Sequence, residues 1–422
     1  MKNKANVTNA SIDSAGLPKD YRQAIAEYIW NGFDAKATHV NLYAEANELG
    51  HIQRIVIEDN GEGIPLETLN ISFGNFLDSL KKKNIQRSSY TRGKKGKGRF
   101  SFSLFATRAT WHTVYLHEGS LLEYSIVIER NQKDEYEDIN KVISKATHTG
   151  TKVILEGVFG ITAAQLSSAE FNTFLAQEFG WFLLLNKDLG FNLSISDEPL
   201  AYEQLILEKD AVVWTIADHQ EQVYPFRINY IRWGDSIGDR YYYYFLNKDK
   251  VEIAKELTSY NNNAIDFHHS VYIESPFFDS FERESLADGE QDNLFSQLNH
   301  HIVYRKLNSD LKEFLYRKQK KYIKEKAAAT YLADIEQKAV LPVFSSAEQD
   351  KKQDLLHVIK ELYCIQPKIF MGIKTETEKT LIGLLHLLLS TPQRDNILPL
   401  MEQLAPLTEE ERSLLSKVLK LN

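Results

Sequence analysis

The sequence predicts an α+β protein, in which helices cover a mixed or antiparallel sheet and two further regions follow. Residues 20–155 alternate helix-like and strand-like segments, the order expected for a layer of helices over a sheet. Strand-like runs then dominate residues 191–280, and helical periodicity dominates from residue 295 onward. We therefore expect three domains, at residues 1–164, 165–295 and 296–422.

The first helix is expected over residues 20–35, because Ile25, Tyr28 and Ile29 recur at helical spacing. Two strands should follow, at residues 38–45 and 52–59, where apolar and polar side chains alternate. A helix is then expected over residues 99–109, in spite of its aromatic residues. Three more strands should complete this part, at residues 109–118, 121–130 and 150–158.

The later segments continue this order. A helix is expected over residues 165–190, where large apolar side chains recur at helical spacing: Phe171, Phe174, Leu175, Phe179 and Phe182. The strands expected in the second domain are residues 191–196, 211–217, 224–233, 240–247 and 270–275. A long helical stretch over residues 295–340 should end near Pro342, and the remaining chain is nearly all helical.

Composition narrows the class of protein. The net charge of −8 over 422 residues argues against a protein that coats nucleic acid along its whole surface, although a local basic patch is compatible with it. The single cysteine, Cys364, excludes an internal disulfide and favours a reducing compartment. The first residues lack the apolar core of a signal peptide, and no apolar run is long enough to span a membrane. We expect a cytoplasmic protein without membrane contact.

A basic, glycine-rich stretch at residues 92–100 has the composition of a phosphate-binding loop. It is not a Walker A loop, because Arg99 and Phe100 stand where that motif needs lysine and a hydroxyl residue. It is not a dinucleotide fingerprint either, because Ser101 replaces the last glycine. What remains is G-x-x-G-x-G at Gly93, Gly96 and Gly98, which alone fits a flexible surface loop equally well.

Two segments earlier in the chain strengthen the interpretation of this stretch as a phosphate-binding loop. Glu27 and Asn31 share one helix face, where a carboxylate can take a proton from water and an amide oxygen can bind Mg²⁺. Asp59 follows a strand and precedes Gly61 and Gly63, so its carboxylate could accept a hydrogen bond from adenine's amine while the glycines allow close approach to the ring. Taken singly, Glu27 and Asn31 are better explained as an ordinary pair on a surface helix, and Asp59 begins a common Asp-Asn-Gly turn.

The ordered set E-x-x-x-N, D-x-G-x-G and G-x-x-G-x-G, followed by Gly150 and Thr151, resembles the GHKL ATPase superfamily with its Bergerat ATP-binding fold. That superfamily includes the ATP domains of gyrase, mismatch-repair proteins, heat-shock chaperones, MORC proteins and histidine kinases. The resemblance covers about residues 15–160. It implies an α/β sandwich that binds ATP with Mg²⁺.

The resemblance also implies a role for each matching residue. Glu27 would be the general base, Asn31 the magnesium ligand, and Asp59 the partner of the adenine amino group. The remaining residues would surround the nucleotide: Gly61 and Gly63 at its wall, Gly93, Gly96 and Gly98 at its phosphates, and Thr151 in the hydrogen-bond network beside adenine. Asp34 shares the helix face of Glu27 and would support it.

Residues 65–99 would form the ATP lid. Nine basic residues and no acidic one lie in residues 81–99, more than a triphosphate requires. The excess charge fits either solvent exposure or contact with nucleic acid or an acidic partner.

The chain resembles the chaperone, MORC, mismatch-repair and gyrase branch more than histidine kinases, because only 26 residues precede Glu27 and a strand-rich, transducer-like segment follows. In that branch a transducer lysine reaches the γ-phosphate, and Lys248, Lys250 and Lys255 are candidates. Its members close as ATP-dependent homodimers, and the residues before Asp20 could exchange between subunits.

The resemblance therefore predicts an ATPase that uses ATP binding and hydrolysis to drive dimerisation and a conformational switch. The alternative is an ATP-sensing scaffold or DNA-binding clamp with little turnover, which recruits a partner effector, for example in bacterial defence. The sequence identifies neither a client nor a partner, and DNA contact stays open.

Overall fold

The computed structural model describes residues 9–14, 17–73, 98–261, 265–280, 301–404 and 409–419. The chain forms two compact units. The first comprises Met1–Leu257 and His268–Arg305, and the second comprises Thr258–Phe267 and Lys306–Asn422. The predicted boundaries at residues 164 and 295 stay predictions.

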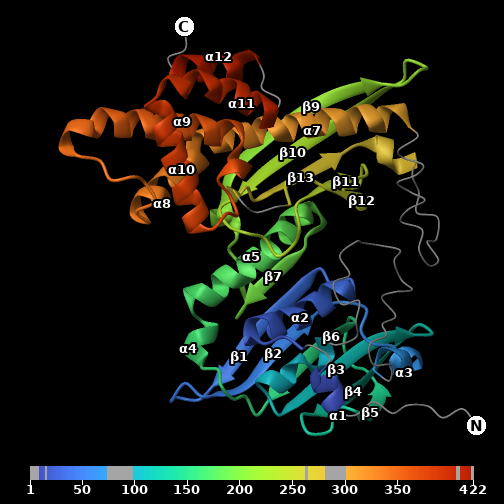
Figure 1. The fold of residues 1–422 in the computed structure, drawn as a ribbon. Helices are drawn as coiled ribbons and strands as arrows, with labels where there is room; N and C mark the ends of the chain where they lie inside the picture. The colour runs from blue at the N-terminus through green and yellow to red at the C-terminus, as the bar shows by residue number, and fades with distance from the viewer. Residues whose placement is uncertain are drawn as a thin grey trace, which may run out of the picture. The chain divides into compact units, whose positions relative to one another are not determined.

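An eight-stranded mixed sheet forms the base of the first unit (Figure 1). Its strands are β1 (His39–Ala46), β2 (Ile52–Asp59), β3 (Arg108–His117), β4 (Ser120–Glu129), β5 (Glu137–Ile143), β6 (Gly150–Glu156), β7 (Asn192–Ile195) and β8 (Glu198–Pro199). They lie in the order β5-β4-β3-β6-β2-β1-β7-β8, and all neighbours are antiparallel except β1 and β7. The sheet places the end of β2 beside the start of β6.

Helix α2 (Tyr21–Asp34) crosses one face of this sheet (Figure 1). The side chain of Asp20 accepts a hydrogen bond from the backbone N–H of Arg22, which caps the helix start. Ile25, Tyr28 and Ile29 are buried, as the sequence predicts. Among the described residues up to Leu185, the other α-helices are α1 (Asn9–Ser14), α3 (Leu69–Ser72), α4 (Ala163–Leu166) and α5 (Ala169–Leu185).

Helix α5 packs beside α2 through aromatic side chains. The ring of Trp30 lies 4.7 Å from that of Phe179 and 5.2 Å from that of Phe182, measured between centroids. Rings at these distances add attraction beyond the apolar area that they bury. Helix α2 is therefore fixed between the sheet and α5.

The helix predicted over residues 99–109 is wrong. The segment Gly98–Leu104 is a short 3₁₀ helix, and β3 begins at Arg108. The hydroxyls of Ser101 and Ser103 donate to the carbonyls three residues before them, at Gly98 and Phe100, and so favour the tighter turn.

Several strands also differ from prediction, among them β7 and β5. Residues 191–196 were expected in the second domain, but β7 pairs in parallel with β1 of the first sheet. Strand β5 was not predicted, because every one of its residues is exposed and it carries no apolar alternation.

A second, five-stranded sheet has the order β12-β11-β13-β10-β9. Its strands are β9 (Ile206–Ala217), β10 (Val223–Trp233), β11 (Tyr242–Leu246), β12 (Glu252–Leu257) and β13 (His269–Glu274). Trp233, Tyr244 and Tyr272 join the same core as α2 and α5. The two sheets are thus linked through α5.

The second unit is helical, as the sequence predicts. Its elements are α7 (Ile302–Tyr322, whose first residues belong to the first unit), a π-helical segment Ile323–Ala327, α8 (Ala328–Gln337), α9 (Gln349–Ile365), α10 (Thr375–Leu389), α11 (Ile397–Leu404) and α12 (Glu409–Val418). Together with the sheets of the first unit, these helices confirm the α+β class. Among the residues that the structure describes, no helix is long and apolar enough to cross a membrane.

Candidate nucleotide-binding site

Asp59 ends β2 and is held by backbone groups of two neighbouring segments. Its Oδ1 accepts hydrogen bonds from the N–H of Gly61 at 2.8 Å and of Thr151 at 3.3 Å. Thr151 is also the cross-strand partner of Asp59 in the β2–β6 ladder. Burial raises the pKa of the Asp59 carboxyl to about 6, in spite of these two hydrogen bonds. A half-buried carboxylate of this kind can accept a further bond from a ligand.

The turn after Asp59 requires its glycines. A Cβ at Gly61 would lie 2.6 Å from the carbonyl oxygen of Ala35, and one at Gly63 would lie 2.2 Å from that of Val114. Gly63 also has a φ of +73°, a backbone conformation that side chains disfavour. The turn therefore lies directly against Ala35, which caps the end of α2, and against β3.

A pair of threonines supports this turn. The N–H of Ile64 donates to Thr113 Oγ1 at 2.8 Å, and Thr113 Oγ1 lies 3.2 Å from Thr151 Oγ1. Thr113 and Thr151 are opposite each other in the β3–β6 ladder. No motif in the sequence indicates Thr113, because only the strand pairing brings it to this turn.

Glu27 and Asn31 occupy unusual positions on α2. From residue 24 to residue 33, every side chain is buried except these two, which are partly exposed. Asp34, one turn further on, is also partly exposed. A surface helix would show a broad polar face instead. The structure thus favours a polar pair placed in an otherwise buried helix over an ordinary solvent-exposed Glu/Asn pair.

Gly98 brings the basic stretch to Glu27. A Cβ at Gly98 would lie 2.7 Å from Glu27 Oε2, so the carboxylate lies against this backbone. Gly93 and Gly96 lie outside the described residues, as does most of the predicted lid.

Tyr28 fixes the spacing between α2 and the segment after Gly98. Its hydroxyl donates to the carbonyl of Arg99 at 2.9 Å and accepts the N–H of Phe102 at 3.1 Å. Burial raises the pKa of this hydroxyl, so it stays protonated and can donate. Sequence reasoning assigned Tyr28 only to the apolar face of the helix.

Arg99 adds a buried cation directly after Gly98. It is 9% exposed, and its guanidinium lies 4.5 Å from the ring centre of Phe100 and 5.7 Å from that of Phe73. Burial lowers its pKa to about 10, which leaves it protonated at neutral pH. The guanidinium therefore lies against aromatic rings of the first unit.

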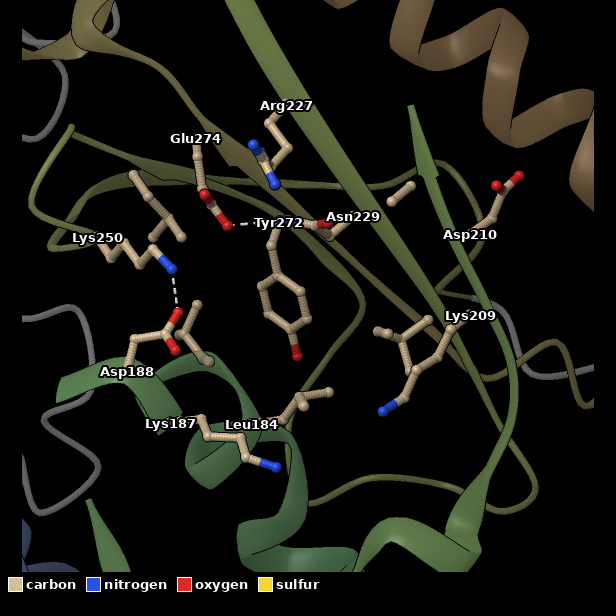
Figure 2. Close-up of a pocket in the computed structure, with 14 residues that line it drawn as sticks. Leu184, Lys187, Asp188, Lys209, Asp210, Arg227, Asn229, Lys250, Tyr272 and Glu274 are labelled. Atoms are coloured by element: carbon tan, nitrogen blue, oxygen red, sulfur yellow. Dashed lines mark hydrogen bonds and ion pairs between the residues drawn. The ribbon is translucent and has the colours of Figure 1, made fainter. Parts of the chain in front are cut away.

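The three lysines considered as γ-phosphate contacts all form ion pairs. Lys248 lies 3.5 Å from Asp279, and Lys255 lies 3.3 Å from Asp239. Lys250 pairs with Asp188 in a separate pocket of about 430 Å³, lined by the end of α5 and the second sheet (Figure 2). Apart from Lys250, none of the described residues predicted for the nucleotide site lines that pocket.

The donor set around Glu27 is compatible with magnesium. Within the described ranges, no group of three or more His, Cys, Asp or Glu side chains could hold a metal ion. Mg²⁺ bound with a nucleotide needs few protein ligands, because phosphate and water oxygens complete its shell. Asn31 can supply such a ligand, and this role stays a prediction.

A match to a known protein family covers the residues of this candidate site. A family model described as "Histidine kinase-, DNA gyrase B-, and HSP90-like ATPase" matches residues 20–156. Residues 20–156 are therefore similar to the ATPase domains of the GHKL superfamily, as the sequence motifs predict. The matched range spans α2, the predicted lid, and strands β1 to β6.

Solved structures that resemble the chain include the ATPase region of Saccharomyces cerevisiae topoisomerase II, and the same region bound to ICRF-187 (dexrazoxane). The first matches at 14% identity and a TM-score of 0.34, covering 60% of this chain and 72% of the other. The second matches at 14% identity and a TM-score of 0.33, covering 60% and 73%. At these scores the superpositions carry no functional argument. No protein with curated function matches the sequence.

Proposed function

We propose that this protein binds Mg²⁺-ATP in its GHKL domain and hydrolyses it, with Glu27 as the general base. The observation that carries the proposal is the placement of Glu27 and Asn31, the two partly exposed side chains of a ten-residue buried run, with Glu27 against Gly98.

Asp59 would recognise the adenine ring. One of its oxygens already accepts two backbone N–H groups, which orients the carboxylate. With a pKa of about 6, the carboxyl is mostly ionised at neutral pH and can accept a bond from the exocyclic amine. Gly61 and Gly63 let the adjoining turn pack closely against the end of α2 and β3, and the N–H of Thr151 helps to hold Asp59 in place.

Glu27 would take the proton from the attacking water, and Asn31, one helical turn away, would bind the metal with its amide oxygen. The metal, when bound, offsets the charge that develops on the phosphate oxygens. Gly98 supplies backbone beside the carboxylate. Gly93 and Gly96 are proposed to hold phosphates through their N–H groups.

We further propose that ATP binding drives homodimerisation and a conformational switch. The support is the similarity of residues 20–156 to a superfamily whose gyrase, mismatch-repair, chaperone and MORC branch closes as ATP-dependent dimers. The second sheet also shares its core with α2 and α5. The scaffold or DNA-clamp alternative differs by having little turnover.

The test compares phosphate release by the wild type with Mg²⁺, the wild type with EDTA, and Glu27→Ala. A helical glutamate of the second unit, Glu361→Ala, serves as the control. We expect magnesium-dependent turnover that falls by about 100-fold or more in Glu27→Ala and stays unchanged in the control. Turnover at the wild-type rate in Glu27→Ala would refute the assignment of the base.

Oligomeric state separates the two functions. Light scattering with and without a non-hydrolysable ATP analogue should show a monomer that becomes a dimer. Tight ATP binding by an unchanged monomer without phosphate release would support the scaffold instead. Salt-dependent, ATP-stimulated DNA binding would support the clamp.

A further inference from the structure

Glu178, on α5, lies where three segments of the first unit meet. Its Oε1 accepts a hydrogen bond from Trp30 Nε1 of α2 at 2.8 Å. The preceding residue, Gln177, accepts the N–H of Gly238 at 2.8 Å, from the loop between β10 and β11. Glu178 and Glu27 also line one small cavity of about 220 Å³. A carboxylate outside the predicted site thus adjoins the proposed base.

Trp30 connects Glu178 to the residues that would act on ATP. It lies three residues after Glu27 and directly before Asn31, and it is only 4% exposed. Rings of α5 fix the indole laterally, while the bond to Glu178 fixes its N–H end. A shift of Glu178 would therefore move the part of α2 that carries Glu27 and Asn31.

The loop of residues 234–241 lies directly on Glu178. A Cβ at Gly238 would lie 2.4 Å from Glu178 Oε2, 2.6 Å from its carbonyl oxygen and 2.7 Å from its Cα. Two of these three atoms are backbone, so the contact admits only glycine unless the loop moves. Gly234 of the same loop has no such restriction, since its Cβ would meet nothing closer than 3.5 Å.

The loop is also anchored to the second sheet. Asp239, the residue after Gly238, forms an ion pair with Lys255 of β12 at 3.3 Å, and both side chains are at most 15% exposed. The ammonium of Lys255 lies 4.4 Å from the ring centre of Tyr242 on β11. A movement of the second sheet would therefore reach Glu178 through Gly238.

We propose that Glu178 is a positioning residue that couples the second sheet to the geometry of Glu27 and Asn31. Its effect on α2 is transmitted through Trp30. The proposal rests on the proposed ATPase function, and it predicts that turnover depends on a loop remote from the nucleotide.

The experiment compares Gly238→Ala with its matched control Gly234→Ala in the full chain. We expect Gly238→Ala to lower kcat about tenfold or more, because small displacements of catalytic groups have large effects on rate. Its Kd for ATP should stay within about twofold of wild type, because the Asp59 turn is untouched, and Gly234→Ala should behave as wild type. A kcat for Gly238→Ala equal to that of Gly234→Ala would overturn the proposal.

Variants of the hydrogen bond give a second test that does not depend on Gly238→Ala folding. Glu178→Gln keeps an oxygen that can accept the indole N–H and should retain kcat within about threefold. Glu178→Leu removes the acceptor and should lower kcat about tenfold without a matching change in Kd. Combined with Trp30→Phe, Glu178→Leu should add little further loss. Additive losses, or a Glu178→Gln variant as slow as Glu178→Leu, would contradict the proposal.

A spectroscopic readout separates this proposal from the ATPase function. With 5-fluorotryptophan in all five positions, Trp30→Phe identifies the ¹⁹F resonance of Trp30. That resonance should shift when a non-hydrolysable ATP analogue binds, and it should be displaced in nucleotide-free Gly238→Ala but not in Gly234→Ala. If the wild type does not hydrolyse ATP, the proposed function fails while this shift still tests the coupling. An unmoved resonance in Gly238→Ala would refute the coupling whatever the turnover.

Discussion

The two ends of the candidate site are built differently. At the Asp59 end, the carboxylate is held by backbone N–H groups of its own turn and of the neighbouring strand, so its position follows from the sheet ladder. At the Glu27 end, α2 is positioned by side chains that reach distant segments, through Tyr28 to Arg99 and through Trp30 to Glu178. The difference suggests that nucleotide recognition is a fixed property of the fold, whereas turnover depends on long-range contacts.

The largest effect is expected at the Asp59 end. Asp59→Asn removes the carboxylate that would accept the adenine amine, and we expect ATP affinity to fall about 100-fold or more, measured by calorimetry. The amide oxygen can still accept the two backbone N–H groups, so the fold should persist. If Asp59→Asn binds ATP with wild-type affinity, Asp59 does not recognise adenine.

The same substitution should stabilise the free protein. Burial raises the pKa of Asp59 from 3.8 to about 6, so the folded state binds this proton more tightly than the unfolded state. The stability that the group contributes is therefore present below about pH 4 and lost as pH rises through about 6. Thermal unfolding at pH 8 should show Asp59→Asn more stable than wild type by about 1–2 kcal/mol, a gain that vanishes near pH 4. A less stable variant at pH 8 would contradict the origin given for the shift.

The rigidity of the Asp59 turn can be tested with a matched pair of glycines. Gly63→Ala introduces both backbone strain and a Cβ 2.2 Å from a carbonyl oxygen, and it should cost about 3 kcal/mol or more of unfolding free energy. Gly50→Ala has a similar φ of +78° but no atom within 4 Å, and it should cost only about 1 kcal/mol. Equal losses in chemical denaturation would show that the close packing of this turn contributes nothing.

The Glu27 end should respond to Tyr28→Phe. This variant keeps the ring but removes the bonds to Arg99 and Phe102, so the free energy of unfolding should fall by about 1–3 kcal/mol. We expect kcat to fall by about threefold to tenfold with little change in ATP affinity. A change in ATP affinity without a change in kcat would contradict the assignment of turnover, and not nucleotide recognition, to the Glu27 end.

A smaller effect is expected from pH. Binding of adenosine, which carries no phosphate, should weaken as pH falls below about 6, because Asp59 then gains a proton and loses acceptor capacity. Asp59→Asn should show no such dependence. Calorimetric titrations between about pH 5 and 8 would measure both, and a flat wild-type profile would separate Asp59 from the adenine.

The sequence predicted the elements whose signals are local. Helix α2 and strands β1 and β2 carry clear apolar periodicity, and two of the motifs behind the superfamily assignment begin in α2 and at the end of β2. The 3₁₀ segment Gly98–Leu104 could not be predicted, because serine side chains and the distant Tyr28 compete with α-helical bonding. The position of β7 likewise depends on parallel pairing with a strand about 150 residues earlier.

The residues of the candidate site also divide into those with a local sequence signal and those that only tertiary contacts bring to the site. The positions of Glu27, Asn31 and Asp59 were proposed from residue type and spacing, and the structure places Glu27 against Gly98 and Asp59 beside Thr151. Thr113, Tyr28 and Glu178 were missed, because each reaches its partner only through tertiary contacts. The functional roles of all these residues stay predictions.

The most direct measurement of the central claim is ATP binding and turnover by Glu27→Gln in the same preparation. The amide keeps the shape of the side chain beside Gly98 but cannot act as a base. The account predicts a Kd for ATP within about threefold of wild type and phosphate release slower by about 100-fold or more. Wild-type turnover by Glu27→Gln, with binding intact, would contradict it.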